Sequence, residues 1–282
     1  MSLVNFNGKI LPADSNIISV YNRSFRYGDG LFESMRCNES GINFIDQHAK
    51  RLLQGLGTLK MSIPKKFTAE YISDQVSKLY VKQEITGDAR VRLMAYRNEG
   101  GLYSPSTHDF SYLIEIEQLD ESGYPLNKDG LSIGIYEEMK KPVNILSNYK
   151  TANALLFVMA GIFKNENKLD ECLIKNEKGD IIEAISCNMF IVKNGVLVTP
   201  ALNSGCVAGV MRETIIGLAG KNDIKVEERR LGLVEVESAD EVFLTNASAG
   251  IKWVGQLGQH KFGNKMSSML SVELQQVVGV VS

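Results

Sequence analysis

Residues 26–33 read Arg-Tyr-Gly-Asp-Gly-Leu-Phe-Glu, so two glycines stand directly before an apolar run. Gly and Asp favour turns because they tolerate backbone conformations that other residues avoid. The stretch therefore predicts a turn that delivers the chain into a strand. On its N-terminal side, Asn7-Gly8 lies between two short apolar runs and predicts a β-hairpin. On its C-terminal side, a second hairpin is expected around Glu39-Ser40-Gly41.

Helices are predicted beyond these hairpins. Asp46 is a candidate cap for a first helix, on which leucines recur at helical spacing, and residues 68–83 predict a second. Strands and helices then mix without strict strand–helix–strand alternation. This favours an α+β arrangement, within the broad α/β class, over a doubly wound fold. The other predicted elements are strands at 90–96, 112–116, 131–136, 171–175, 180–185, 189–193 and 240–245, and helices at 150–164, 207–220 and 266–278.

The composition is that of an ordinary globular protein, with 44% hydrophobic and 23% charged residues. The length of 282 residues is about twice that of a typical domain of ~150 residues, which allows two medium-sized domains. A polar segment with Gly123 and Pro125 predicts a linker at 118–125, between an N-terminal domain at 1–117 and a C-terminal domain at 126–282. The net charge of -2 argues against a nucleic-acid partner.

The four cysteines, at 37, 172, 187 and 206, form no CxxC pair, and no histidine lies beside one. This spacing is typical of neither a zinc site nor a disulfide framework, and no metal is expected. Scattered thiols favour a reducing compartment. The longest apolar run, 154–163, is far shorter than the ~20 residues of a membrane span. We therefore expect a cytoplasmic protein without a membrane partner.

Three charged residues stand in sequence contexts that chemistry can use. Lys150 precedes the most apolar run, and a lysine set against apolar surroundings can act as an amine nucleophile. Glu183 lies inside an apolar strand and Arg51 on the first helix, while Gly209 lies in a predicted helix start that can bind phosphate. Each alone is more often a solvated residue or a plain turn. Together they match the needs of pyridoxal phosphate: a lysine for a Schiff base, an acid for the ring nitrogen, and donors for the phosphate.

The order and local sequence of these motifs resemble the class IV aminotransferase family, which includes branched-chain aminotransferases, D-amino acid aminotransferases and aminodeoxychorismate lyases. The resemblance runs from the Phe25-Arg26-Tyr27-Gly28-Asp29-Gly30 stretch to Thr245-Asn246-Ala247, nearly the whole chain. It implies the two-domain architecture of fold type IV, with pyridoxal 5'-phosphate in the cleft between the domains. It also implies a homodimer.

The same resemblance implies roles for single residues. In His48-Ala49-Lys50-Arg51-Leu52, which is similar to the family's H-x-x-R-L, Arg51 would bind the cofactor phosphate. Lys150 is similar to the catalytic Schiff-base lysine. Glu183 and Asn188 fall on the family's E-x-x-x-x-N-x-F, in which Glu183 would pair with the pyridine nitrogen. The other implied cofactor contacts are Val210 and Met211 at a helix start, and Thr245 and Asn246 on a turn.

The implied activity is transfer of an amino group between an amino acid and a 2-oxo acid through the Lys150 Schiff base. Branched-chain members carry a tyrosine five positions after the lysine, where this chain has Leu155. The run Gly209-Val210-Met211-Arg212 looks more like the G-I-M-R of the lyase branch. Two alternatives therefore stay open: an aminodeoxychorismate lyase that acts on aminodeoxychorismate and releases pyruvate and 4-aminobenzoate, and a catalytically inactive homodimeric binding protein.

Four residues are candidates for substrate recognition. Arg92 and Arg97 lie on or after a strand that leads into a long Gly, Pro and Ser loop, and either can bind a substrate carboxylate or form a structural ion pair. Phe32 and Tyr103 are candidates for the wall of the substrate pocket.

Overall fold

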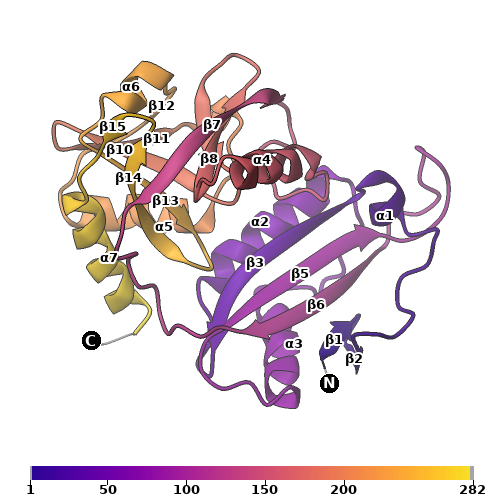
Figure 1. Cartoon of the computed structure of the whole chain (residues 1–282). Helices are drawn as coiled ribbons and strands as arrows, with labels where there is room; N and C mark the ends of the chain where they lie inside the picture. Colours follow the sequence, from indigo (N-terminus) through magenta and orange to yellow (C-terminus); the bar gives the residue numbers. More distant parts are fainter. Residues whose placement is uncertain (1, 280–282) are drawn as a thin grey trace. The chain divides into compact units, whose positions relative to one another are not determined.

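The computed structural model describes residues 2–279 (Figure 1). Met1 and residues 280–282, which belong to the predicted domains at 1–117 and 126–282, lie outside the described residues. The chain divides into two compact units. Unit 1 comprises Met1–Ser122 and Tyr149–Asn153, and unit 2 comprises Gly123–Asn148 and Ala154–Ser282. The first division, between Ser122 and Gly123, falls within residues 118–125.

Unit 1 is built on a six-stranded sheet of order β2-β1-β6-β5-β3-β4, in which every neighbouring pair is antiparallel. Asn7 and Gly8 have φ angles of 51° and 88°, as a tight hairpin turn requires, so the first predicted hairpin is confirmed. The second is confirmed by the pairing of Cys37 with Ile42. The strands are β1 (Leu3–Phe6), β2 (Lys9–Pro12), β3 (Gly30–Asn38), β4 (Gly41–Ile42), β5 (Ala89–Arg97) and β6 (Phe110–Gln118). The helices are α1 (Arg23–Tyr27), α2 (Ile45–Thr58) and α3 (Ala69–Lys82).

Helices α2 and α3 cover the sheet of unit 1, α2 against β3 and α3 against β6 (Figure 1). Each presents an apolar stripe to the core, with Leu52 and Leu56 on α2, and Ile72 and Leu79 on α3, all buried. These residues pack against the sheet's buried apolar side chains in one contiguous core.

The starts of these two helices differ from each other. The Thr68 side chain accepts a hydrogen bond from the Tyr71 N–H and caps α3, near the predicted start of that helix. The prediction that Asp46 caps α2 is wrong. The chain enters α2 through Phe44, which has the left-handed conformation, so Asp46 already lies in the first turn. There the negative charge of Asp46 interacts favourably with the positive end of the helix dipole.

The short segment Tyr149–Asn153 pairs with β3 although it is far away in sequence. The Phe32 N–H donates to the Lys150 carbonyl at 2.8 Å, and the Ala152 N–H donates to the Gly30 carbonyl at 2.9 Å. These two bonds form an antiparallel bridge on the edge of β3. The segment thus satisfies backbone groups at the start of β3, whereas β4 pairs with the end of the same strand, at Cys37 and Asn38.

This pairing corrects two predictions. The helix expected at 150–164 begins only at α4 (Leu155–Glu166), because the backbone just before it is extended and paired with β3. Residues 126–282 were expected to form one domain, whereas Tyr149–Asn153 group with unit 1. Sequence periodicity reports only local pattern, and this segment is placed by a partner about 120 residues away.

Unit 2 is built on a nine-stranded mixed sheet of order β12-β11-β10-β13-β14-β7-β8-β9, with β15 paired to β14. Strand β7 runs parallel to both β8 and β14, and β11 runs parallel to β12. The strands are β7 (Leu131–Lys141), β8 (Glu171–Asn176), β9 (Ile181–Ala184), β10 (Asn188–Lys193), β11 (Val196–Pro200), β12 (Val226–Arg229), β13 (Glu241–Asn246), β14 (Gly250–Leu257) and β15 (His260–Lys261). The helices are α4, η1 (Leu202–Ser204), α5 (Val210–Lys221), α6 (Leu233–Glu237) and α7 (Lys265–Val277).

The helices of unit 2 pack against the sheet in two groups. Helix α4 contacts β7 and β8, while α5 and α7 contact each other and β13. The start of α5 at Val210 is three residues later than predicted, because the residues before it bond to other parts of unit 2. Within residues 2–279, no helix has both the length and the apolar character needed to cross a membrane.

Two glycines on α2 allow a matched test of this packing. A Cβ on Gly55 would lie 2.6 Å from Leu31 and 3.2 Å from Tyr149, so Gly55→Ala should destabilise unit 1 by roughly 1–3 kcal/mol. For Gly57, no heavy atom of the described chain lies within 4 Å of such a Cβ, and Gly57→Ala should stabilise the helix by up to about 1 kcal/mol. Urea unfolding of both variants checks this. Equal stability of the two would contradict the close approach of Gly55.

Candidate functional site

The first cluster of candidate residues joins β3 to α2 in unit 1. The Glu33 carboxylate accepts hydrogen bonds from Arg51, at 2.8 Å from Nε and 2.5 Å from Nη2, and lies 2.7 Å from His48 Nδ1. His48 and Arg51 are three residues apart, which places both on the face of α2 turned towards β3. All three side chains are buried, Glu33 with only 3% of its surface exposed. Arg51 is therefore held in a fixed plane by a side-on, two-bond ion pair.

The charges of this cluster follow from its contacts. Burial opposes ionisation of Glu33, but the Arg51 guanidinium and the His48 hydrogen bond outweigh it and lower the pKa of Glu33 to about 2. Burial also holds the pKa of His48 below its ordinary value, against the raising effect of Glu33. A neutral His48 then donates from Nδ1 to Glu33. Its Nε2 is buried and has no hydrogen-bond partner among the described residues.

Glu33 was not predicted as a site residue, although a sequence signal exists. It alternates with Leu31 and Met35, which are both buried, so all three point to the same face of β3. A carboxylate on the core face of a strand needs a cationic partner. The pattern alone does not say that this partner is Arg51.

Lys150 is placed by the pairing of its segment with β3. Its Nζ lies 4.8 Å from the centroid of the Phe32 ring, and the Arg92 guanidinium lies 4.0 Å from the same ring. The structure thus brings together three of the predicted residues. Cation–π contacts of this kind favour positive charge next to the ring. Arg92 is also 4.0 Å from Glu115 on the neighbouring strand.

The other two substrate candidates, Arg97 and Tyr103, have different surroundings. Arg97 is buried, and its guanidinium bonds the Asp29 carboxylate at 2.9 Å and the Leu59 carbonyl at 2.6 Å, with His108 at 3.3 Å. These contacts make Arg97 a structural ion pair, which was the alternative open for it. Tyr103 lies on the long loop with 89% of its surface exposed.

The second cluster of candidate residues, in unit 2, centres on Glu183. This residue lies on β9 and is buried, with 3% of its surface exposed, where a solvent-facing position was the simpler expectation. Its Oε1 accepts from Lys141 Nζ at 2.5 Å, and its Oε2 accepts from the Val207 N–H at 2.8 Å. Lys141 was not predicted, because it belongs to no recognised motif.

The start of α5 is organised by Asn188. Its Nδ2 donates to the Val207 carbonyl at 2.8 Å, and a Cβ on Gly209 would lie 1.7 Å from its Oδ1. Position 209 therefore requires a residue without a side chain. The N–H groups of Val210 and Met211 lie in the first turn of α5, where no intrahelical acceptor exists for them. Such a helix start attracts anions.

Thr245 adds a hydroxyl beside Asn188. The two residues are direct partners in the β10–β13 pairing, so their side chains share one face, and α5 packs against β13. Thr245 Oγ1 is buried without a hydrogen-bond partner in the described part of the chain. Asn246 closes the following turn by accepting from the Ser248 and Ala249 N–H groups at 3.0 and 2.7 Å. An unsatisfied hydroxyl near a helix N-terminus fits a phosphate group.

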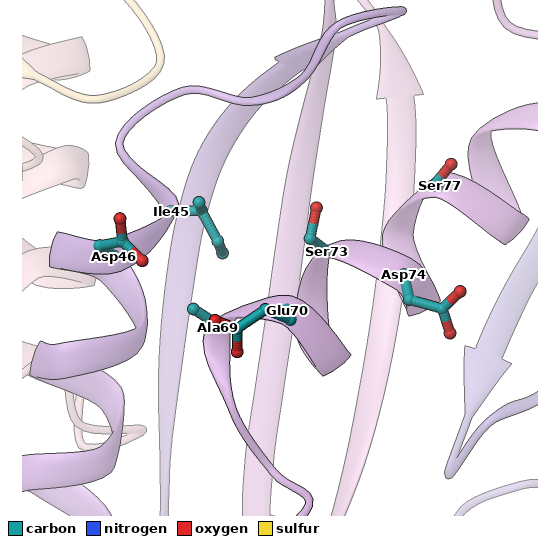
Figure 2. A pocket seen from close by; sticks show the side chains of 7 residues that line it. All are labelled: Ile45, Asp46, Ala69, Glu70, Ser73, Asp74 and Ser77. Carbon is teal, nitrogen blue, oxygen red and sulfur yellow. The ribbon is translucent and has the colours of Figure 1, made fainter.

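An open hollow lies elsewhere in unit 1, between the starts of α2 and α3 (Figure 2). Its volume is about 390 Å³, and three acidic residues and two serines contribute to its wall. One of these acidic residues, Asp74, is already paired with Lys78 at 2.6 Å. The lining residues are Ile45, Asp46, Ala69, Glu70, Ser73, Asp74 and Ser77, all different from the predicted site residues.

Residues 30–256 match the family model of amino-transferase class IV. The chain belongs to the class IV aminotransferase family. This confirms the family predicted from the motifs, and with it an enzyme of the aminotransferase class. The matched range includes Arg51, Lys150 and Glu183.

Individual relatives agree with the family match. The chain is 31% identical over 287 residues to the "Probable branched-chain-amino-acid aminotransferase" of Aquifex aeolicus, covering 98% of this chain and 91% of that one. It is 25% identical over 272 residues to the aminodeoxychorismate lyase of Bacillus subtilis, covering 95% and 91%. Residues 209–212 look like the lyase branch, but the chain as a whole is more similar to the branched-chain aminotransferase, so the comparisons do not favour a lyase.

Solved structures show the same fold. The branched-chain aminotransferase from Thermoproteus uzoniensis, solved with norvaline, has a TM-score of 0.89 at 23% identity and covers 98% of this chain and 94% of that one. The enzyme from Thermobaculum terrenum in PLP-form has a TM-score of 0.84 at 22% identity and covers 99% and 95%. The predicted fold type IV is thereby confirmed.

The buried carboxylate of unit 1 makes the stability of the protein depend on acid. Because the pKa of Glu33 is lowered from 4.5 to about 2, its stabilising effect is present above pH 4.5 and is lost as the pH falls towards 2. Glu33→Gln should therefore flatten the pH dependence of the free energy of unfolding in this range. At neutral pH it should cost about 3 kcal/mol, because Arg51 loses its charged partner.

Glu117→Gln is the matched control. Glu117 also pairs with an arginine, Arg90, but both side chains are exposed, so the change should be below about 1 kcal/mol. Urea unfolding over a series of pH values measures all three proteins. An acid profile of Glu33→Gln that follows the wild type would show that Glu33 does not carry this effect.

Proposed function

We propose that this chain is a pyridoxal-phosphate-dependent branched-chain-amino-acid aminotransferase, which moves an amino group between a branched-chain amino acid and a 2-oxo acid. The observation that carries this is the 31% identity, over 98% of the chain, to a relative of that name. The lyase relative is less similar, at 25%. The norvaline and PLP-form structures of the same fold support an amino acid substrate and this cofactor.

The residues of unit 2 suit two ends of the cofactor. When bound, pyridoxal phosphate supplies a protonated ring that withdraws electrons from the α-carbon of an amino acid. Glu183 would accept the hydrogen bond of the ring nitrogen, because a carboxylate favours the protonated ring. The first N–H groups of α5, at Val210 and Met211, and the unsatisfied hydroxyl of Thr245 would hold the phosphate. Asn188 and Asn246 would keep the two flanking turns in shape.

The residues of unit 1 would supply the amine and a cation. Lys150 would hold the cofactor aldehyde through its Nζ and, once released by the incoming substrate, carry the α-proton. Two backbone hydrogen bonds to β3, through the Lys150 carbonyl and the Ala152 N–H, fix the main chain directly after its Cα. Arg51, held in plane by Glu33, would donate to the phosphate. Phe32 would line the space next to the Lys150 amine.

A homodimer remains a prediction from the family resemblance, and a cytoplasmic location remains a prediction from the scattered thiols and the short apolar runs of the sequence. The lyase remains a second candidate because Leu155, the first residue of α4, replaces the tyrosine of branched-chain members. Leucine has no hydrogen-bonding group for the cofactor's phenolic oxygen.

A two-substrate assay tests the proposal. The purified protein with pyridoxal phosphate should convert leucine, isoleucine or valine and 2-oxoglutarate into glutamate and the matching 2-oxo acid. Lys150→Ala should lose this activity by several orders of magnitude, because the amine is lost. Lys82→Ala, on the exposed end of α3, should keep it. Formation of pyruvate and 4-aminobenzoate from aminodeoxychorismate, without transfer, would instead establish the lyase.

A second test isolates the phosphate cradle. Gly209→Ala should displace Asn188 and lower the affinity for pyridoxal phosphate about tenfold, or about 1.4 kcal/mol, while the affinity for pyridoxal, which lacks the phosphate, stays unchanged. Gly217→Ala, in the same helix, is the control, because a Cβ there has no described atom within 4 Å. Absorbance titration of the apoprotein measures both affinities. An unchanged affinity of Gly209→Ala for pyridoxal phosphate would exclude this end of α5 as the phosphate site.

A further inference from the structure

Glu183 in unit 2 is held by a lysine that no motif contains. Lys141, the last residue of β7, donates from Nζ to Glu183 Oε1 at 2.5 Å. The same Nζ donates to the Ser147 carbonyl at 3.0 Å and lies 5.6 Å from the centroid of the Phe157 ring. Only 11% of the Lys141 side chain is exposed. Three contacts therefore fix the ammonium, and a surface ion pair would not be fixed in this way.

This pair fixes the orientation of the carboxylate. A charged group buried in a protein is strongly disfavoured unless it has a partner of opposite charge. Lys141 supplies the cation on one oxygen, and the Val207 N–H bonds the other. Because each carboxylate oxygen has two acceptor positions, these contacts orient Glu183 and still leave room for another donor. The nearby Cys206 thiol, whose pKa burial and Glu183 raise to about 11, stays protonated.

Glu183 is also connected, through Val207, to the start of α5, where we propose that the phosphate binds. The Val207 peptide is held on one side by Glu183 and on the other by Asn188, which packs against Gly209. The position of Glu183 is thus coupled to the chain that enters α5.

We infer that Lys141 is a positioning residue: it holds the Glu183 carboxylate in the orientation that receives the ring N–H of pyridoxal phosphate. The inference rests on the proposed function. Lys141 acts through Glu183 and is not itself a catalytic residue. A purely structural role would instead make it equally important for any ligand of this site.

An analogue of pyridoxal phosphate with C–H in place of the ring nitrogen separates these roles, because it has no N–H for Glu183. We expect the wild type to bind pyridoxal phosphate more tightly than the analogue. Lys141→Met should weaken binding of pyridoxal phosphate roughly tenfold and leave binding of the analogue unchanged. Lys141→Arg, which keeps the charge, should restore most of the preference. Lys140→Met, an exposed lysine one position earlier on β7, is the matched control.

The measurements are dissociation constants from titration of each apoprotein, together with its melting temperature. If Lys141→Met does not fold, Lys141→Gln, which keeps a donor without the charge, takes its place. The inference alone is overturned if Lys141→Met weakens the binding of pyridoxal phosphate and of the analogue equally. It is also overturned if Lys141→Met still binds pyridoxal phosphate more tightly than the analogue, to the same extent as the wild type. A wild type that binds no pyridoxal phosphate, or a Glu183→Gln variant with an unchanged preference for it, overturns the proposed role of Glu183 and this inference with it.

Discussion

The pairing of β3 with the segment Tyr149–Asn153 is the interaction on which the arrangement of unit 1 depends. Two backbone hydrogen bonds, from Phe32 to Lys150 and from Ala152 to Gly30, fix the main chain directly after the lysine, around Thr151. The reach of the amine is then set by its own side-chain rotamers. The same strand carries Glu33, which fixes Arg51 on α2. One strand therefore positions both the candidate amine and the candidate phosphate ligand of this unit.

In each unit, a charged residue proposed to bind the cofactor is held in a buried ion pair. Arg51 is buried against Glu33, and Glu183 is buried against Lys141. A buried charge is tolerated only when it is paired, and the pair also restricts its rotamers. The orientation of both groups is thereby set by the protein's own contacts before any ligand arrives, which is the kind of preorganisation that binding and catalysis exploit.

Sequence patterns predicted most of the local structure and the motif residues, and they failed where distant partners decide. The Asn7-Gly8 hairpin and the Thr68 start of α3 depend on neighbouring residues, and both were predictable. The extended backbone at Lys150 was not, because its partner is β3. Lys141 was missed for the same reason, since its role exists only through contact with Glu183. The grouping of Tyr149–Asn153 with unit 1 likewise cannot be read from composition.

The detour of the chain has a consequence for synthesis on the ribosome. Unit 1 takes its first 122 residues in one continuous run, but the segment that covers the edge of β3 emerges only with residues 149–153. Until then, the edge presents unpaired N–H and C=O groups, which are a template for pairing with other chains. If the first sheet forms before these residues emerge, it stays open at this edge until the segment arrives. The lysine proposed for catalysis arrives within the segment that closes it.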